Sequence, residues 1–109
     1  MPRLVIDTNV FISSLLRRSY PFLVVDTIFK ERKNFELCVS NELLNEYNDV
    51  FNRIKFFKYV DYEIKSKILL SDIKKFGIKY SPSVKIDTIK DEADNRLLGL
   101  FLKYAKLNI

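Results

Sequence analysis

The most informative absence from this sequence of 109 residues is histidine, which does not occur at all. Serine triads, cysteine–histidine dyads and histidine-based zinc or iron sites all need that side chain, so these classes of site are excluded. The single cysteine, Cys38, cannot form an internal disulfide and favours a reducing compartment. Any chemistry must therefore come from carboxylates, hydroxyls, amides, lysine, arginine or tyrosine.

Glycine and proline are also scarce, with two and three copies, which indicates long regular elements and short connections. No apolar run approaches the roughly 18 residues that a membrane-spanning helix needs. The first apolar stretch is interrupted by Asp7 and Asn9, too early for a signal peptide. We therefore expect a cytoplasmic protein without a membrane segment.

Length and composition fit one domain that spans residues 1–109. Hydrophobic residues make up 48% of the chain, enough to form a core, and charged residues make up 30%. The net charge of +5 favours a polyanionic partner, although a lysine-rich surface explains the same excess.

Strand and helix patterns alternate along the chain. Short apolar strands are expected at 3–7 and 35–39, with a weak extended region at 78–89. Helices are expected at 10–18, 21–33, 40–51, 61–77 and from 91 onward, with Ser40, Asp61 and Asp91 as N-caps. This alternation predicts an α/β fold with right-handed βαβ units and a parallel sheet.

Several acids are expected to meet at one edge of that sheet. Asp7 follows the first strand, and Glu42 and Glu46 share one face of the helix after the second strand. Asp91 and Asp94 open the last helix. The carboxyl ends of parallel strands lie at one edge, where converging carboxylates repel one another unless a divalent cation lies between them. Oxygen-only ligands favour Mg²⁺ or Mn²⁺.

Each acid also has a purely structural interpretation. The segment Asp7-Thr8-Asn9 is typical of a turn whose side chain caps the next helix. Asp91 with Asp94 is typical of an N-cap and a first-turn acid, and Glu46 of a solvated helix face. The joint placement of these acids, rather than any one of them, favours the metal site.

Three segments together resemble the PIN domain family, and more narrowly its small single-domain prokaryotic members, often the toxins of toxin–antitoxin pairs. The segments are LVIDTNVFISSLL at 4–16, FELCVSNELLNEY at 35–47 and DEADNRLLGLFLKYAK at 91–106. The resemblance implies a three-layer α/β/α domain with a short parallel sheet flanked by helices. It also implies a Mg²⁺- or Mn²⁺-dependent endoribonuclease that hydrolyses single-stranded RNA.

The same resemblance assigns roles to individual residues. Asp7 and Asp94 match the inner metal ligands, and Glu46 matches an acid that holds a metal-bound water or second ion and acts as a general base. Asn9 matches a polar residue of the family, and either Asn9 or Thr8 is expected to orient a carboxylate or the water. Basic residues expected to guide RNA to this site are Arg17, Arg18, Lys90 and Arg96.

The sequence departs from the family pattern after the last helix. Family members continue into a further strand and a loop whose acid completes the site, whereas this sequence reaches only Lys106–Ile109. We therefore expect a C-terminally truncated domain whose three acids hold one weakly bound ion. Because the missing strand would lie beside the first one, the edge of Leu4–Ile6 is expected to be unpaired.

Two other functions remain open. A degenerate PIN-like module would bind an antitoxin protein or RNA without cleaving it; the missing fourth acid favours this, and the three retained acids argue against it. A phosphotransfer domain would use Asp7 as a nucleophile. Haloacid-dehalogenase-like enzymes, however, need a second aspartate where Asn9 stands, and the acidic pair and lysine of response-regulator receivers are not evident.

Homodimerisation is also expected, since members of the family usually pair. The apolar faces at Leu23–Ile28 and Tyr47–Phe57 are the predicted surfaces for this contact.

Overall fold

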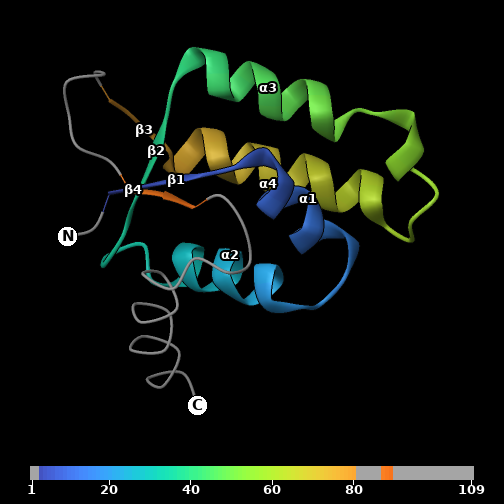
Figure 1. Ribbon diagram of the computed structural model, residues 1–109, viewed down its shortest axis with the longest axis horizontal. Helices are drawn as coiled ribbons and strands as arrows, with labels where there is room; N and C mark the ends of the chain where they lie inside the picture. Colours follow the sequence, from blue (N-terminus) through green and yellow to red (C-terminus); the bar gives the residue numbers. More distant parts are fainter. Residues whose placement is uncertain (1–2, 81–86, 90–109) are drawn as a thin grey trace.

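A computed structural model describes residues 3–80 and 87–89 of the chain. Its elements are β1 (Arg3–Ile6), α1 (Thr8–Leu16), α2 (Tyr20–Lys30), β2 (Glu36–Val39), α3 (Asn41–Phe51), the 3-10 helix η1 (Ile54–Phe56), α4 (Tyr62–Phe76), β3 (Ile78–Lys79) and β4 (Asp87–Ile89). The strands form a parallel sheet in the order β3-β2-β1-β4 (Figure 1). The predicted α/β fold with a short parallel sheet is confirmed.

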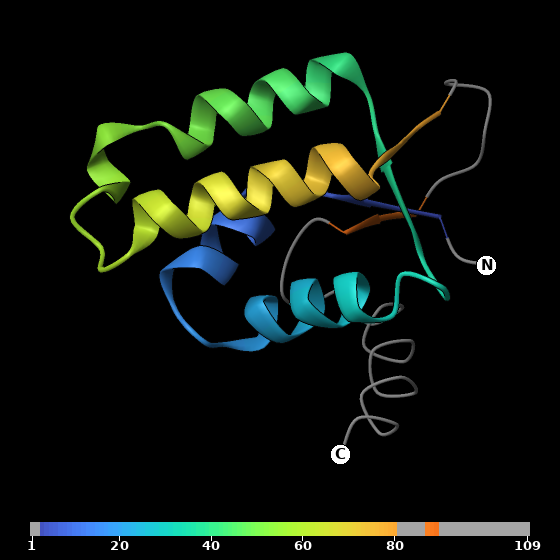
Figure 2. The same cartoon turned by 180° about the vertical axis from the view of Figure 1, so that it is seen from behind.

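The hydrophobic core forms where the helices pack against β1 and β2. Leu4 and Ile6 of β1 are fully buried, as is Phe11 of α1. Full burial of such a side chain stabilises the fold by about 1.5–3 kcal/mol. Helix α1 contacts α2, α3 and α4, and Figures 1 and 2 show it between α2 and the α3–α4 pair. The start of α1 is therefore held by core packing on several sides.

The prediction that β1 has an unpaired edge is wrong. β1 pairs with β2 on one side, where Leu4 lies opposite Leu37, and with β4 on the other, where Ile6 lies opposite Ile89. The extended region at 78–89 supplies two strands, because β3 adds beside β2 and β4 adds beside β1. β1 is consequently a central strand of the described sheet.

Ser40 and Asp61 each precede a helix, but only Ser40 caps its helix with its side chain. The Ser40 hydroxyl caps α3 as predicted, since its Oγ accepts a hydrogen bond from the Leu43 N–H at 3.1 Å. Asp61 precedes α4 as expected, but its side chain makes no capping hydrogen bond and its φ is 60°. Asp61 thus serves as a left-handed turn residue, a conformation that aspartate tolerates better than most side chains.

The apolar faces predicted for dimerisation lie largely inside the protein's own core. Buried residues within them are Val24, Val25, Ile28, Tyr47 and Phe51, and the large exposed ones are Leu23, Ile54 and Phe57. The buried side chains pack against their own domain, whereas Leu23 on one face and Ile54 and Phe57 on the other stay exposed. Homodimerisation stays a prediction. In the part of the chain that the structure describes, no helix is long and apolar enough to span a membrane.

Gly77 ends α4 where the helix comes close to β2. A Cβ at this position would lie 2.4 Å from the Ile73 carbonyl oxygen and 3.0 Å from Cγ1 of Val39. The Gly77 N–H also donates to that carbonyl at 2.8 Å. The close approach, rather than an unusual φ, is what requires glycine here.

We predict that Gly77→Ala lowers the free energy of unfolding by about 1–3 kcal/mol, because the added methyl group must displace backbone or strand atoms. Urea denaturation followed by circular dichroism measures this. Ser71→Ala, on the exposed surface of α4, is the control and should change stability by less than about 0.5 kcal/mol. Equal stabilities of the two variants would contradict the packing argument.

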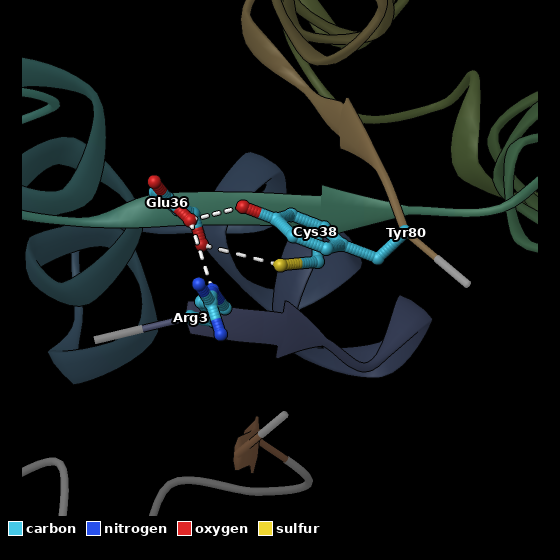
Figure 3. A network of polar contacts seen from close by, with 4 residues as sticks. All are labelled: Arg3, Glu36, Cys38 and Tyr80. Atoms are coloured by element: carbon cyan, nitrogen blue, oxygen red, sulfur yellow. Dashed lines mark hydrogen bonds and ion pairs between the residues drawn. The ribbon is translucent and has the colours of Figure 1, made fainter. Parts of the chain in front are cut away.

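Three side chains, from β1, β2 and the residue after β3, form the polar network shown in Figure 3. Arg3 Nε lies 3.3 Å from Glu36 Oε2, and the Tyr80 hydroxyl donates to the same oxygen. These bonds, with that from Tyr80 the larger influence, hold the pKa of the Glu36 carboxyl below its ordinary value. Cys38 lies beside this network, and burial raises the pKa of its thiol, which makes it a poor nucleophile.

A lowered folded-state pKa means that the Glu36 carboxylate stabilises the protein above its ordinary pKa of 4.5 and loses this effect as the pH falls through the lowered value. We predict that wild type melts at a higher temperature than Glu36→Gln at neutral pH and that the gap closes in acid. Melting temperatures measured from neutral pH to well below 4.5 test this. A gap that is independent of pH would show that the charge contributes nothing.

Candidate metal-binding site

Asp7 lies between the end of β1 and the start of α1. Its carbonyl accepts the Val10 N–H at 3.0 Å and so begins the helix, but its side chain makes no capping hydrogen bond. The interpretation of Asp7 as a side-chain cap is therefore wrong. A half-buried carboxylate stands at the N-terminus of α1 without the structural task that the sequence pattern suggested.

Glu46 reaches the same place from α3. The Thr8 hydroxyl donates to Glu46 Oε2, with 2.5 Å between the oxygens. Thr8 is the first residue of α1 and is 5% exposed, whereas Glu46 belongs to the exposed side of α3. Since Thr8 directly follows Asp7, this bond brings the second carboxylate to the start of α1 from 38 residues away in sequence.

Tyr47 ties α3 to the end of β1. Its hydroxyl donates to the Ile6 carbonyl oxygen at 2.5 Å, and the side chain is fully buried. Burial, and then the charges of Glu46 and Asp7, raise the pKa of this phenol. Thr8 directly follows Asp7 and bonds to Glu46, so both acids stand at the start of α1. The structure thus brings the predicted pair Asp7 and Glu46 together.

These two carboxylates are suitable donors for a small divalent cation. Mg²⁺ and Mn²⁺ prefer carboxylate oxygens. The Thr8 hydroxyl bonds to Oε2 of Glu46 and not to its other carboxylate oxygen. Within residues 3–80 and 87–89 no group of three or more aspartate, glutamate, cysteine or histidine residues is close enough to hold a metal. The described residues therefore fit part of a ligand set, and Asp94, the predicted third ligand, lies outside them.

The other predicted site residues differ in position. Asn9 is exposed in the first turn of α1, two residues from Asp7, and Glu42 is exposed in the first turn of α3. The role predicted for Asn9 stays a prediction. Lys90 and Arg96 lie outside the described residues.

Arg17 and Arg18 are not brought to the acids. They follow α1, whose nine residues span about 13 Å from the end that carries Asp7. The Arg18 guanidinium lies 5.0 Å from the centre of the Phe22 ring. Both arginines border a cavity of about 380 Å³ formed by α1, α2 and α4. The helix carries the chain away from the acidic edge, which the sequence-based placement did not take into account.

Thr8 was expected, as an alternative to Asn9, to orient a carboxylate or the water, and its hydroxyl does bond to the Glu46 carboxylate. Sequence reasoning missed the contact made by Tyr47, which was expected only as part of the apolar face of α3. A buried tyrosine normally needs an acceptor for its hydroxyl, and that requirement was the available signal. The identity of the acceptor depends on how α3 packs against β1, which no local pattern reveals.

The protein is thus an α/β domain with a pair of carboxylates, Asp7 and Glu46, at the point where β1 meets α1. The chain belongs to the PIN domain family, which matches residues 3–106. The resemblance found in the three sequence segments is thereby confirmed. PIN domains are in general nucleases and depend on divalent metal ions.

One relative is the uncharacterized protein MJ1680 of Methanocaldococcus jannaschii, which is 29% identical over 100 residues. The alignment covers 90% of this chain and 63% of that protein, so the chain spans less than two thirds of the relative's length. No solved structure matches the chain significantly.

We predict that Asp7→Asn, without added metal, changes the free energy of unfolding by less than about 0.5 kcal/mol. The lost attraction between the charge and the N-terminus of α1 is offset by weaker repulsion from Glu46. Ser40→Ala is the matched comparison, because it removes a side chain that does cap its helix and should cost about 1 kcal/mol. Urea denaturation compares the two; a larger loss for Asp7→Asn would show that Asp7 has a structural task.

Proposed function

We propose that this protein is a metal-dependent endoribonuclease that hydrolyses phosphodiester bonds of single-stranded RNA. The observation that carries the proposal is the half-buried Asp7 carboxylate, free of helix capping, beside a Glu46 carboxylate held by Thr8. Membership of the PIN domain family supports the nuclease class. The net charge of +5 is consistent with a polyanionic substrate. RNA as the substrate is part of the proposal.

In this proposal Asp7 and Asp94 would hold Mg²⁺ or Mn²⁺. When bound, the cation would neutralise charge at the phosphate and make the attacking water more acidic. Glu46 holds the attacking water and accepts its proton, because Thr8 keeps its carboxylate at the start of α1. Asn9, exposed one position further along, orients the water or a phosphate oxygen.

The N-terminus of α1 favours a substrate phosphate at this site. Its first N–H groups carry a partial positive charge, which favours a bound anion beside Asp7. The phosphate thus meets positive charge from the helix while the acids retain the cation.

The toxin role, an antitoxin protein as partner and a homodimeric state are proposals that rest on the narrower resemblance to small prokaryotic PIN domains. The non-catalytic alternative, a module that binds an antitoxin or RNA without cleavage, is an outcome of the experiment below.

We predict that the folded protein cleaves labelled single-stranded RNA in the presence of Mn²⁺ or Mg²⁺ and that EDTA abolishes cleavage. Asp7→Asn should reduce the rate at least about 100-fold, since it removes a charge that holds the cation. Asp61→Asn is the control: it makes the same chemical change at an exposed turn whose left-handed backbone asparagine also tolerates.

Three results would contradict the proposed function. These are cleavage that survives EDTA, equal activities of Asp7→Asn and Asp61→Asn, and no cleavage by a protein shown to be folded. The last result would favour the non-catalytic module.

A further inference from the structure

A buried hydrogen bond, in addition to the bond from Thr8 to Glu46, joins the two segments that carry the acids. Its donor is the Tyr47 hydroxyl, and Tyr47 directly follows Glu46; its acceptor is the carbonyl of Ile6, which directly precedes Asp7. We propose that Tyr47 is a positioning residue that sets the separation of the Asp7 and Glu46 carboxylates and thereby the affinity of the site for a divalent cation. This inference rests on the proposed function, because it presumes that these carboxylates hold a cation.

The position of this bond at the end of β1 explains why it affects the placement of both acids. The pairing of β1 with β2 extends over Arg3 and Leu4, opposite Glu36 and Leu37. Ile6 lies two residues beyond that pairing, where β1 turns into α1. On its other side Ile6 pairs with Ile89 of β4, so the Tyr47 bond fastens α3 to an end of β1 that the sheet already holds.

The Tyr47 bond opposes the electrostatic repulsion between the Asp7 and Glu46 carboxylates. Two carboxylates that lie near one another repel, and this repulsion acts to separate the end of β1 from α3 when no cation is bound. The bonds from Tyr47 to Ile6 and from Thr8 to Glu46 both oppose that separation. A site held in place before the cation arrives binds it more tightly than one that must first close.

The ring of Tyr47 and its hydroxyl have separable roles. The ring packs edge-on against Phe11, with centroids 5.0 Å apart, and parallel to Phe51 at 6.1 Å. Those ring contacts belong to the core, and the phenylalanine of the Tyr47→Phe variant keeps them. The hydroxyl alone makes the bond to Ile6, so Tyr47→Phe removes the tie and keeps the packing.

Tyr62 provides a matched control in the same protein. It is 1% exposed, and its hydroxyl donates to the Phe51 carbonyl oxygen at 2.8 Å. Phe51 is the last residue of α3, five positions beyond Glu46. Burial alone raises the pKa of Tyr62, to about 12, with no carboxylate contributing. Tyr62→Phe therefore deletes the same kind of buried bond without touching the acids.

The test is Mn²⁺ binding to the full chain, measured by titration calorimetry and by the electron paramagnetic resonance signal of free Mn²⁺. We expect the dissociation constant to rise about tenfold in Tyr47→Phe and less than about twofold in Tyr62→Phe. Urea midpoints without metal should fall by similar amounts in the two variants. Replacing Tyr47 by 4-aminophenylalanine, which keeps a donor in place, should restore the affinity to within about twofold of wild type.

The outcomes separate the inference from the proposed function. Equal Mn²⁺ affinities of Tyr47→Phe and Tyr62→Phe would overturn the inference and leave the nuclease proposal intact. An unfolded Tyr47→Phe would also overturn it, because the hydroxyl would then support the fold as a whole. A folded wild type that binds no Mn²⁺ would overturn the proposed function and the inference together.

Discussion

The packing of α3 against the end of β1, held by the hydrogen bond from Tyr47 to the Ile6 carbonyl, is the interaction on which the site depends. β1 is a central strand, paired on both sides and buried at Leu4 and Ile6, so its end is a fixed point in the fold. α3 is attached to that point through Tyr47, and the adjacent Glu46 is thereby brought to Thr8. Asp7 and Glu46 lie on separate elements, and this attachment brings them to the same end of α1.

Ser40 and Asp7 hold the same position at the start of their helices but differ in what their side chains do. Ser40 caps α3 with its side chain, whereas Asp7, at the equivalent position of α1, makes no such bond. Placing an uncapped carboxylate beside a second one works against stability, because like charges repel. The proposed cation would offset this repulsion, in keeping with the divalent-metal dependence that is general among PIN domains.

The local patterns of the sequence predicted what depends on local physics. Apolar periodicity and the Ser40 cap were enough for the helices and for the parallel sheet, and the position of Asp7 after β1 was enough to place it at the site. Contacts set by the path of the chain were beyond such patterns. The pairing of β1 with β4 depends on which edge of the sheet β4 joins, and the distance of Arg17 and Arg18 from Asp7 depends on the direction of α1. The acceptor of the Tyr47 hydroxyl depends on how α3 lies against the end of β1.

The most direct test of the account is a crystal structure grown with Mn²⁺, in which anomalous scattering locates the ion. The account predicts an anomalous peak at the start of α1, in contact with a carboxylate oxygen of Asp7 and bound to Glu46 directly or through one water, with the Tyr47 hydroxyl still bonded to Ile6. A well-ordered site without such a peak, or a peak bound to other side chains, would contradict it.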